Sequence, residues 1–303
     1  MVAVIAGPTA SGKSALAMAV AERIGGTIIN ADASQLYADL AVVSARPSVA
    51  DEARVPHLLY GVLDGDDVAS AARWAGMAKA AIAEVKAAGR VPILVGGTGM
   101  YLTTLIDGIA PVPEVDAAVR AVVRDMATAD AMVALEREDA LLAARLMPAD
   151  RQRILRGLEV VRSSGRSLLH WQATRVGGIG GEMDVRVVMV DCPRPLLHAR
   201  AETRLRAMVD AGAMDEVAAL LARGLADDRP VLRALGVAQF GAVVAGQMTV
   251  EAAIADAATA TRQYQKRQLT WARNQVADWP RVAADGAAGL VAAWQDEGGI
   301  EQK

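Results

Sequence analysis

Hydrophobic residues in the first hundred positions fall alternately into short apolar runs and into longer segments with helical spacing. The runs have the length of buried strands, and the longer segments repeat apolar residues every three to four positions. The strand-like and helix-like segments follow one another as 2–6, 14–24, 27–30, 57–63, 69–89 and 91–95. Such alternation is typical of a parallel sheet with helices on both faces. We therefore predict an α/β core at the start of the chain.

The alternation stops near residue 110, where Pro111 and Pro113 interrupt the chain. Only helical spacing follows, until a strand pattern resumes at 184–192 after the glycine-rich connector at 176–181. Residues 194–278 are again helical. We predict a discontinuous α/β core with a helical C-terminal part and an all-helical insertion domain on a mobile connection, bounded as 1–110 with 182–303 for the core and 111–181 for the insertion.

Composition and charge add a candidate ligand class. The net charge is −3, yet seven arginines and two acids lie between residues 145 and 175, and four basic residues and no acid lie between 261 and 275. Two cationic segments on an acidic chain favour binding of a polyanion, although charge runs are commonly solvated helix faces. The single cysteine excludes a disulfide framework, and no apolar run is long enough to span a membrane.

The segment GPTASGKS at 7–14 fits the phosphate-binding loop G-x-x-x-x-G-K-[ST]. It lies between a predicted strand and a predicted helix, which is the context that this loop requires. Backbone N–H groups of residues 10–14 would hold phosphate oxygens, Lys13 would neutralise them and Ser14 would reach Mg²⁺. The octet predicts a polyphosphate site in a P-loop NTPase-like fold, without saying whether a phosphoryl group is transferred.

Two further polar segments follow predicted strands and should meet this loop at the carboxyl edge of the sheet. Asp32 can hold Mg²⁺ or accept a proton, and a helix cap or turn explains it equally. Thr98 follows two glycines that permit close approach of a ligand, and a tight turn is the alternative. In ATPases a second strand usually ends in an aspartate that binds Mg²⁺. The predicted strand at 91–95 is followed by Gly96, Gly97 and Thr98 instead, so this signal is incomplete.

Arginines on two predicted helices are weaker candidates. Arg153 and Arg156 are three residues apart and share one helical face, and Arg200 and Arg204 are spaced to clamp a phosphate. A solvated surface helix explains either pair equally well.

Several motifs in a fixed order make the chain resemble the bacterial tRNA dimethylallyltransferases, also called isopentenyl-diphosphate:tRNA transferases. The resemblance covers almost the whole length and rests on GPTASGKS, DASQLY, SARP, VPHLLYGVLD, GRVPILVGGTGMYLTTLIDG, DRQRILRGLEV and ATRQYQKRQLTW. It implies transfer of a dimethylallyl group from dimethylallyl diphosphate to N6 of adenosine 37, immediately 3′ of the tRNA anticodon. Pyrophosphate is then the leaving group, and no phosphoryl group moves.

The resemblance also implies roles for individual residues. Asp32 would be the general base, Thr98 would orient the target nucleotide and Arg204 would stabilise the leaving group. The diphosphate would bind Gly7, Thr9, Ala10, Ser11, Gly12, Lys13, Ser14 and Arg204, with Mg²⁺ on Ser14. The tRNA anticodon stem-loop, gripped by the insertion with its target base flipped out, would contact Asp32, Ala33, Ser34, Gln35, Thr98, Arg120, Gln152, Arg153, Arg156, Arg233 and Gly236.

The chain departs from the family at four positions. Ala33 directly follows Asp32 where the family usually has serine, and Val43, Val237 and Asn274 also replace residue types that are common there. These departures bear on individual tRNA contacts and not on the reaction.

Three rival functions share part of these signals. A P-loop kinase for a small substrate or an adenylate isopentenyltransferase would have no need of a cationic insertion. A catalytically silent tRNA-binding protein would have no need of Lys13, Ser14, Asp32 and Thr98. We expect a cytoplasmic monomer that binds tRNA and dimethylallyl diphosphate and does not contact a membrane.

Overall fold

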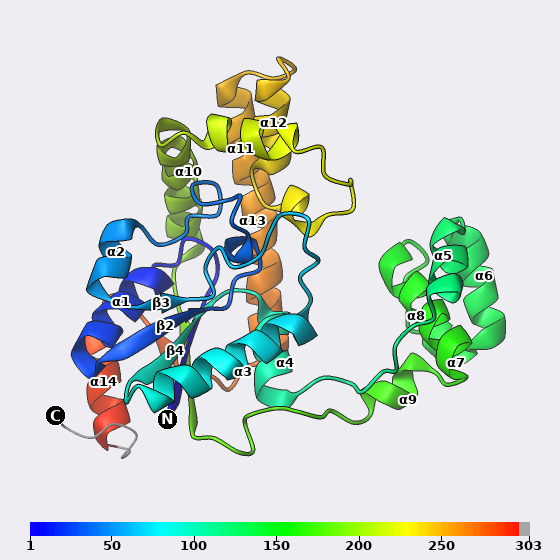
Figure 1. The fold of residues 1–303 in the computed structure, drawn as a ribbon, viewed down its shortest axis with the longest axis horizontal. Coiled ribbons are helices and arrows are strands. Elements are labelled where there is room, and N and C mark those ends of the chain that lie inside the picture. The colour runs from blue at the N-terminus through cyan, green and yellow to red at the C-terminus, as the bar shows by residue number, and fades with distance from the viewer. Residues whose placement is uncertain (297–303) are drawn as a thin grey trace. The chain divides into compact units, whose positions relative to one another are not determined.

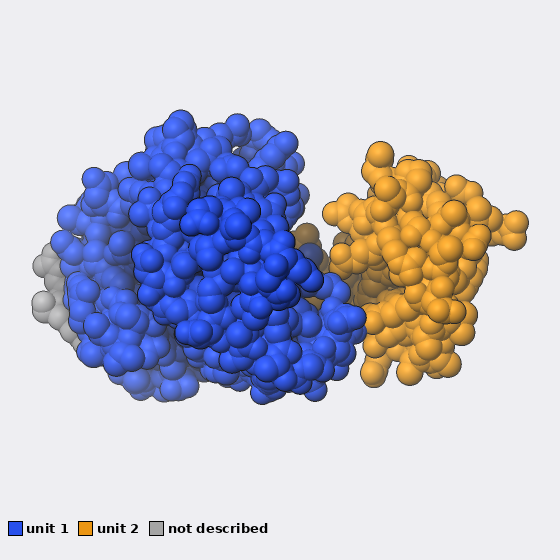
Figure 2. Space-filling view, turned by 90° about the horizontal axis from the view of Figure 1, so that it is seen from above, with its two compact units in different colours: residues 1–104, 180–303 blue, residues 105–179 orange. Residues whose placement is uncertain are grey.

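The structure is a computed structural model that describes residues 1–296 of the 303. Contacts divide the chain into two compact units (Figure 2). Unit 1 comprises residues 1–104 and 180–303, and unit 2 comprises residues 105–179. Unit 2 overlaps the region in which the sequence predicts a helical insertion. No helix within residues 1–296 has the length and apolar character needed to cross a membrane.

Six parallel strands form the sheet of unit 1, in the order β3-β2-β4-β1-β5-β6. In the centre, Ala6 pairs with Gly96 on one side and with Met189 on the other. The strands are β1 (Val2–Ala6), β2 (Gly26–Asn30), β3 (His57–Leu58), β4 (Val91–Gly96), β5 (Val185–Val190) and β6 (Arg281–Val282). Burial on both faces explains why most of them read as continuous apolar runs. The predicted α/β parallel sheet is confirmed.

Helices cover both faces of this sheet (Figure 1). On one face, Leu16 of α1 and Trp294 of α14 pack with Ile5 and Ile93 in one buried cluster. On the other, the buried Trp74 of α3 stacks on Tyr101 of α4 at 4.7 Å between ring centroids. The helices that lie wholly or partly in unit 1 are α1 (Lys13–Ile24), α2 (Val49–Arg54), α3 (Ala71–Ala87), α4 (Gly99–Asp107), α10 (Arg194–Asp210), α11 (Ala213–Ala222), α12 (Val237–Val244), α13 (Val250–Gln275) and α14 (Ala287–Asp296), with 3₁₀ turns η1 (Ser34–Leu36) and η2 (Pro230–Arg233). The end of α4, from Leu105, belongs to unit 2.

Two segments differ from the sequence-based prediction. The strand predicted at 57–63 is only two residues long, because Leu59 adopts a left-handed φ of 64° and turns the chain out of the sheet. Beyond Trp279 and Pro280, where the sequence carries little signal, β6 completes the sheet edge and α14 packs on α1.

Unit 2 is helical and has a hydrophobic core of its own. Val123, Leu135, Leu142, Ile154 and Leu158 form this core and are almost completely buried. Its helices are α5 (Ala117–Asp125), α6 (Thr128–Glu138), α7 (Ala140–Ala143), α8 (Arg151–Ser164) and α9 (Leu168–Gln172).

The two chain segments that lead into and out of unit 2 are hydrogen-bonded to one another. Ile109 and Val176 form an antiparallel bridge, and Ile179 N–H donates to Leu105 O at 2.9 Å. A Cβ atom at Gly178 would lie 2.4 Å from Ile106 O, so glycine permits this close approach. Gly178, one of the glycines that predict a flexible connector, thus also has a packing role.

Candidate active site

The phosphate loop connects β1 to α1 as the sequence predicts. Gly12 caps the helix with a left-handed φ of 92°, which glycine adopts without strain. A Cβ at this position would approach the side chain of Ala284 to 2.8 Å. The first turn of α1 therefore presents free backbone N–H groups, an arrangement that binds anions.

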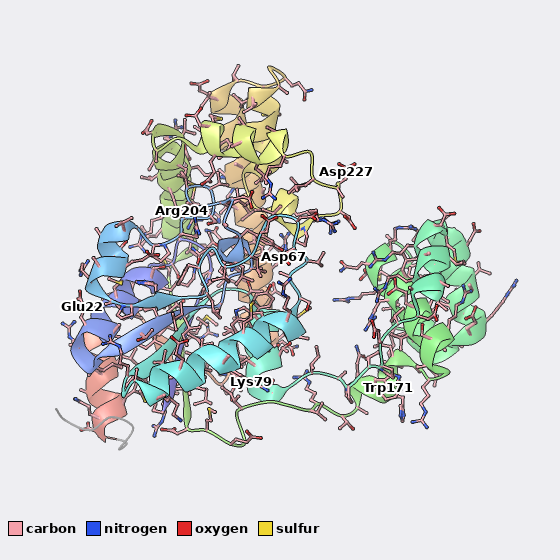
Figure 3. The ribbon with its side chains drawn as sticks, in the orientation of Figure 1. Glu22, Asp67, Lys79, Trp171, Arg204 and Asp227 are labelled. Atoms are coloured by element: carbon pink, nitrogen blue, oxygen red, sulfur yellow. The ribbon has the colours of Figure 1, made fainter. Side chains whose placement is uncertain are left out.

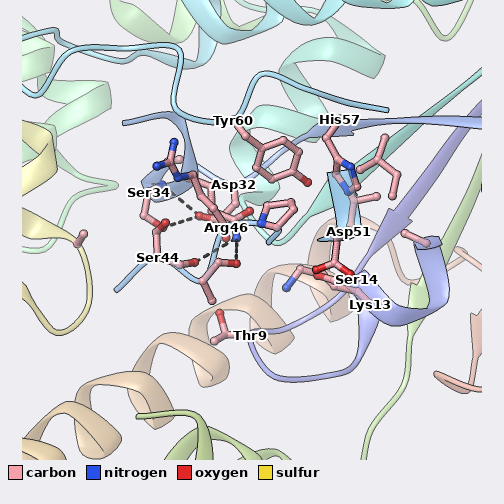
Figure 4. Close-up of a pocket in the computed structure, with 18 of the residues that line it drawn as sticks. Thr9, Lys13, Ser14, Asp32, Ser34, Ser44, Arg46, Asp51, His57 and Tyr60 are labelled. Carbon is pink, nitrogen blue, oxygen red and sulfur yellow. Dashed lines mark hydrogen bonds between the residues drawn. The ribbon is translucent and has the colours of Figure 1, made fainter. Parts of the chain in front are cut away.

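Lys13 and Ser14 bring charge and an oxygen ligand from this loop into a cavity of about 670 Å³ (Figure 4). Burial lowers the pKa of Lys13 to about 8, and the nearby Asp32 carboxylate opposes this shift. An anionic ligand beside the ammonium group would favour its charged form. The site is thus complementary to a phosphate or diphosphate.

Asp32 follows β2 and is held by side chains on both sides of it. Asn30 Oδ1 accepts from Asp32 N–H at 2.8 Å, and Asn30 Nδ2 donates to the backbone oxygen of Asp32 at 2.9 Å and to that of Leu59 at 3.0 Å. Ser34 donates to Asp32 Oδ1 from its backbone at 3.1 Å and from its hydroxyl at 2.7 Å (Figure 4). Both bonds fall on Oδ1, so Oδ2 can accept a proton or hydrogen bond from a ligand. Ser34 thus provides a hydroxyl for this carboxylate although residue 33 is alanine.

Thr98 lies next to the Asp32 segment. Its backbone N–H donates to Ala31 O at 3.3 Å, and its hydroxyl oxygen accepts from Ala33 N–H at 3.1 Å. A hydrogen bond also joins Thr98 to Tyr264, whose pKa burial raises to about 12. The hydroxyl of Thr98 is therefore fixed beside the general-base candidate.

Of the two arginines spaced as a clamp on α10, only Arg204, which is labelled in Figure 3, is among the residues that line the cavity. Burial lowers the pKa of Arg204, and the Asp32 carboxylate opposes the shift. Arginine keeps its proton in proteins, so the guanidinium provides a positive charge here. Arg200 instead donates to the backbone oxygen of Ser11 at 3.3 Å. Arg200 supports the phosphate loop while Arg204 faces the ligand space.

The cavity gathers part of the predicted site. Nine of the predicted residues line it, namely Thr9, Lys13, Ser14, Asp32, Ala33, Ser34, Gln35, Arg204 and Arg233. Gly7, Ala10, Ser11, Gly12, Thr98 and Gly236 lie in the loops and turns that carry or adjoin these side chains. Arg120, Gln152, Arg153 and Arg156 belong to unit 2.

The segment that follows Asp32 is held by contacts that the sequence does not announce. Gln35 Nε2 donates to the backbone oxygens of Ser44 at 3.1 Å and Ala45 at 2.7 Å. Glu216 of α11 accepts from three consecutive backbone N–H groups, those of residues 41–43, at 2.6 to 2.8 Å. This carboxylate fixes the loop containing Val43, which lines the cavity.

Helix α13 supplies site residues for which the sequence analysis gave no individual role. Tyr264 and Arg267 line the cavity, and the Arg267 guanidinium lies 5.3 Å from the Tyr264 ring centroid. Gln265 and Gln268 are buried and bond to the phosphate loop. Both glutamines lie in the segment ATRQYQKRQLTW, and their spacing of three residues, which puts them on one helical face, is the signal that could have found them.

In unit 2, several arginines of the basic segment at 145–175 bind partners within the unit itself. Arg151 donates to the backbone oxygens of Met126 at 2.6 Å and Arg124 at 2.8 Å, and Arg162 pairs with Glu138 at 2.6 Å. Arg153 has 76% of its side chain exposed and lies 3.5 Å from Asp150.

The other unit 2 candidates differ in their surroundings. Gln152 is exposed, and Arg156 is partly exposed and lies 3.8 Å from Glu159. Arg120 is half-buried on α5, and its Nε has no hydrogen-bond partner within the described part of the chain. Gln152, Arg153 and Arg156 therefore form the accessible polar end of α8.

Known proteins are similar to this chain over most of its length. A family model described as IPP transferase matches residues 35–275. The chain is 55% identical to the tRNA dimethylallyltransferase of Sphingopyxis alaskensis over 281 residues, which is 92% of each chain. It is 50% identical over 277 residues to the protein of the same name from Rhodospirillum rubrum, covering 90% of this chain and 85% of the other.

Solved structures agree as well. The tRNA isopentenylpyrophosphate transferase of Bacillus halodurans superposes with a TM-score of 0.70 at 27% identity, covering 98% of this chain and 95% of the other. A eukaryotic dimethylallyltransferase crystallised acting on tRNA shares the fold with a TM-score of 0.84 at 22% identity, covering 100% and 81% of the two chains. The chain belongs to the IPP transferase family.

Proposed function

We propose that the chain transfers a dimethylallyl group from dimethylallyl diphosphate to N6 of adenosine 37 in tRNA, with the chemistry in the cavity of unit 1. One observation carries the assignment of the site: the phosphate loop, Asp32 and Arg204 meet around a single cavity. A leaving diphosphate and an acceptor amine need these three kinds of group together.

In the reaction, the N6 nitrogen of adenine attacks C1 of the dimethylallyl group. The new N6–C1 bond forms as the C1–O bond breaks, and pyrophosphate departs with the bonding electrons. The displaced N6 proton passes to Asp32, which lines the cavity and whose Oδ2 receives neither of the two Ser34 hydrogen bonds. Thr98, fixed through Ala33 and Tyr264, orients the acceptor nucleotide.

The leaving group is stabilised where negative charge develops. The N–H groups at the start of α1, the Lys13 ammonium and the Arg204 guanidinium all adjoin the diphosphate position. The exposed Ser14 hydroxyl beside this position, together with diphosphate oxygens, is the kind of oxygen ligand set that Mg²⁺ prefers. Bound there, Mg²⁺ would supply further charge neutralisation of the pyrophosphate.

We assign acceptor binding to both units. Ser34, Gln35 and Arg233 line the cavity, and Gly236 caps α12 close to them in the chain. Polar or cationic groups on α5 and α8 come from Arg120, Gln152, Arg153 and Arg156. Phosphate contacts of this kind position a nucleic acid without reading its sequence. Because the acceptor is tRNA, we expect the protein to act in the cytoplasm, and we expect a monomer.

The test is direct. Purified protein, Mg²⁺ and dimethylallyl diphosphate are incubated with unmodified tRNA that carries adenosine 37, and with a matched tRNA that has guanosine there. The first tRNA should gain one C₅H₈ unit with stoichiometric release of pyrophosphate, and the second should gain none. Parallel reactions contain ATP with small acceptors, or AMP in place of tRNA. Phosphoryl transfer from ATP or prenylation of AMP, with an unchanged tRNA mass, would contradict the proposal.

A further inference from the structure

Gln268 of α13 is a buried side chain that is hydrogen-bonded to two loops at once. Its Oε1 accepts from the backbone N–H of Thr9, in the phosphate loop, at 2.9 Å. Its Nε2 donates to the backbone oxygen of Gly97, in the loop that carries Thr98, at 3.0 Å. The side chain is 7% exposed. A single amide thus joins three segments that are far apart in the sequence.

The local geometry favours an amide at this position. Backbone groups of the two loops face each other here, since Gly7 N–H donates to Gly96 O at 3.3 Å. A Cβ at Gly97 would lie 2.2 Å from Gln268 Nε2 and 2.8 Å from Gly7 O. Glycine therefore leaves the space that the amide occupies. A side-chain amide offers a donor and an acceptor in one rigid plane, so it satisfies both loops at any pH.

The two loops carry opposite partners of the proposed reaction. The phosphate loop holds the leaving diphosphate, and the residue after Gly97 is Thr98, which contacts the backbone on both sides of Asp32. A displacement at carbon requires the amine, the carbon and the leaving oxygen to lie in line, and a misplacement of about 1 Å costs about a hundredfold in rate.

We propose that Gln268 is a positioning residue that sets the separation between the diphosphate and the acceptor amine by fixing both loops to α13. This inference rests on the proposed function. It concerns the alignment of bound substrates, so its signature is a loss of kcat without a matching loss of binding.

Gln265 provides a matched control one turn earlier on the same helix. It is 1% exposed, and its Nε2 donates to the backbone oxygens of Thr9 at 2.9 Å and Leu197 at 3.3 Å. Those bonds hold the phosphate loop, whereas the bond to Gly97 belongs to Gln268. Comparing the two glutamines therefore distinguishes the effect of anchoring the phosphate loop alone from that of joining it to the loop of Gly97.

The experiment compares Gln268→Met with Gln265→Met in the full chain, since methionine is unbranched and of similar size. Melting temperature, kcat, KM for dimethylallyl diphosphate and Kd for tRNA are measured for each. We expect similar falls in melting temperature, because each variant loses buried hydrogen bonds. Gln268→Met should lose about 30- to 100-fold in kcat with KM and Kd within about threefold, and Gln265→Met should lose less than about fivefold in kcat.

Gln268→Glu gives a second readout and serves if the methionine variant fails to fold. The ionised carboxylate accepts from Thr9 but repels the oxygen of Gly97, whereas the protonated form donates to it. Burial raises the pKa of a carboxyl group. The kcat of this variant, divided by that of the wild type at the same pH, should therefore rise about tenfold from about pH 8 to about pH 6.

Three results would overturn the inference: wild-type kcat in Gln268→Met, equal losses of kcat in the two methionine variants, or a flat pH ratio in Gln268→Glu. A wild-type protein that does not prenylate tRNA would instead contradict the proposed function. The two failures are therefore distinguishable.

Discussion

Arg204 of unit 1 and the arginines of unit 2 have different surroundings. In unit 1, Arg204 is half-buried and lines the cavity. The Asp32 carboxylate favours its charged form by raising its pKa against the effect of burial. In unit 2, Arg151 and Arg162 bind backbone oxygens or an acid within the unit, and Arg153 remains mostly exposed. A run of arginines in a sequence therefore overstates the charge available to a ligand, and the partners of each side chain decide its role.

The sharpest test of unit 1 concerns its carboxylate. Asp32→Asn keeps the shape of the side chain but removes its ability to accept a proton, so kcat should fall by about 10²- to 10⁴-fold. The affinity for tRNA, measured by filter binding, should stay close to that of the wild type. Asp191→Asn is the matched control, since Asp191 also follows a strand end but is exposed and does not line the cavity. Equal losses in the two variants would contradict the assignment of Asp32.

The arginines of α10 give the next largest expected effect. Arg204→Gln removes a positive charge from the leaving-group side of the cavity, so kcat should fall by about 10²- to 10³-fold. Arg200→Gln removes a bond to the oxygen of Ser11, which contributes about 1 kcal/mol, and a contact with the Cys192 sulfur at 3.7 Å. Single-turnover rates for the two variants measure the contrast. A larger loss of kcat for Arg200→Gln than for Arg204→Gln would contradict the assignment of Arg204 to the leaving group.

Unit 2 offers the converse contrast. Arg153→Ala removes an exposed charge and should weaken tRNA binding by about five- to tenfold, with a smaller dependence of the affinity on salt. Arg162→Ala leaves Glu138 without its partner, so it should lower the melting temperature more than the tRNA affinity. Titrations at several salt concentrations, together with thermal unfolding, separate the two. If Arg162→Ala weakened tRNA binding and Arg153→Ala did not, the roles assigned to the two arginines would be contradicted.

The smallest expected effect is a pH dependence of diphosphate binding. Because burial lowers the pKa of Lys13 to about 8, the free protein loses this positive charge as the pH rises through that value. The Kd for pyrophosphate should therefore increase about threefold between about pH 7.5 and about pH 8.5. Calorimetric titration of the wild type measures it, and Lys13→Met should bind more weakly with a flatter profile. An unchanged Kd in the wild type would show that Lys13 does not face the anion.

Local chemistry explains which parts of the fold the sequence predicts. The octet at 7–14 specifies strand, loop and helix within a short stretch, and these elements are confirmed. By contrast, β6 has two residues and α14 owes its burial to distant contacts of Leu290 and Trp294, so neither leaves a strong local pattern. The strand predicted at 57–63 fails because a single left-handed residue ends it.

The same distinction applies to the site. Asp32 and Thr98 follow strands in recognisable motifs, so sequence reasoning places them at one sheet edge. The contacts of Gln268 and Glu216 span 259 and about 175 residues of chain, and nothing near either residue indicates its partner. Such long-range polar contacts depend on tertiary packing, which is why the structure is needed to find them.

The paired chain segments at Ile109 and Val176 have an evolutionary consequence. The segments that lead into and out of unit 2 are hydrogen-bonded to each other, and unit 2 has its own hydrophobic core. A phosphate-loop core can gain, lose or exchange such a module in one event without altering the register of its sheet. Under the proposed function, in which unit 2 binds the acceptor, acceptor choice and transfer chemistry can then diverge independently.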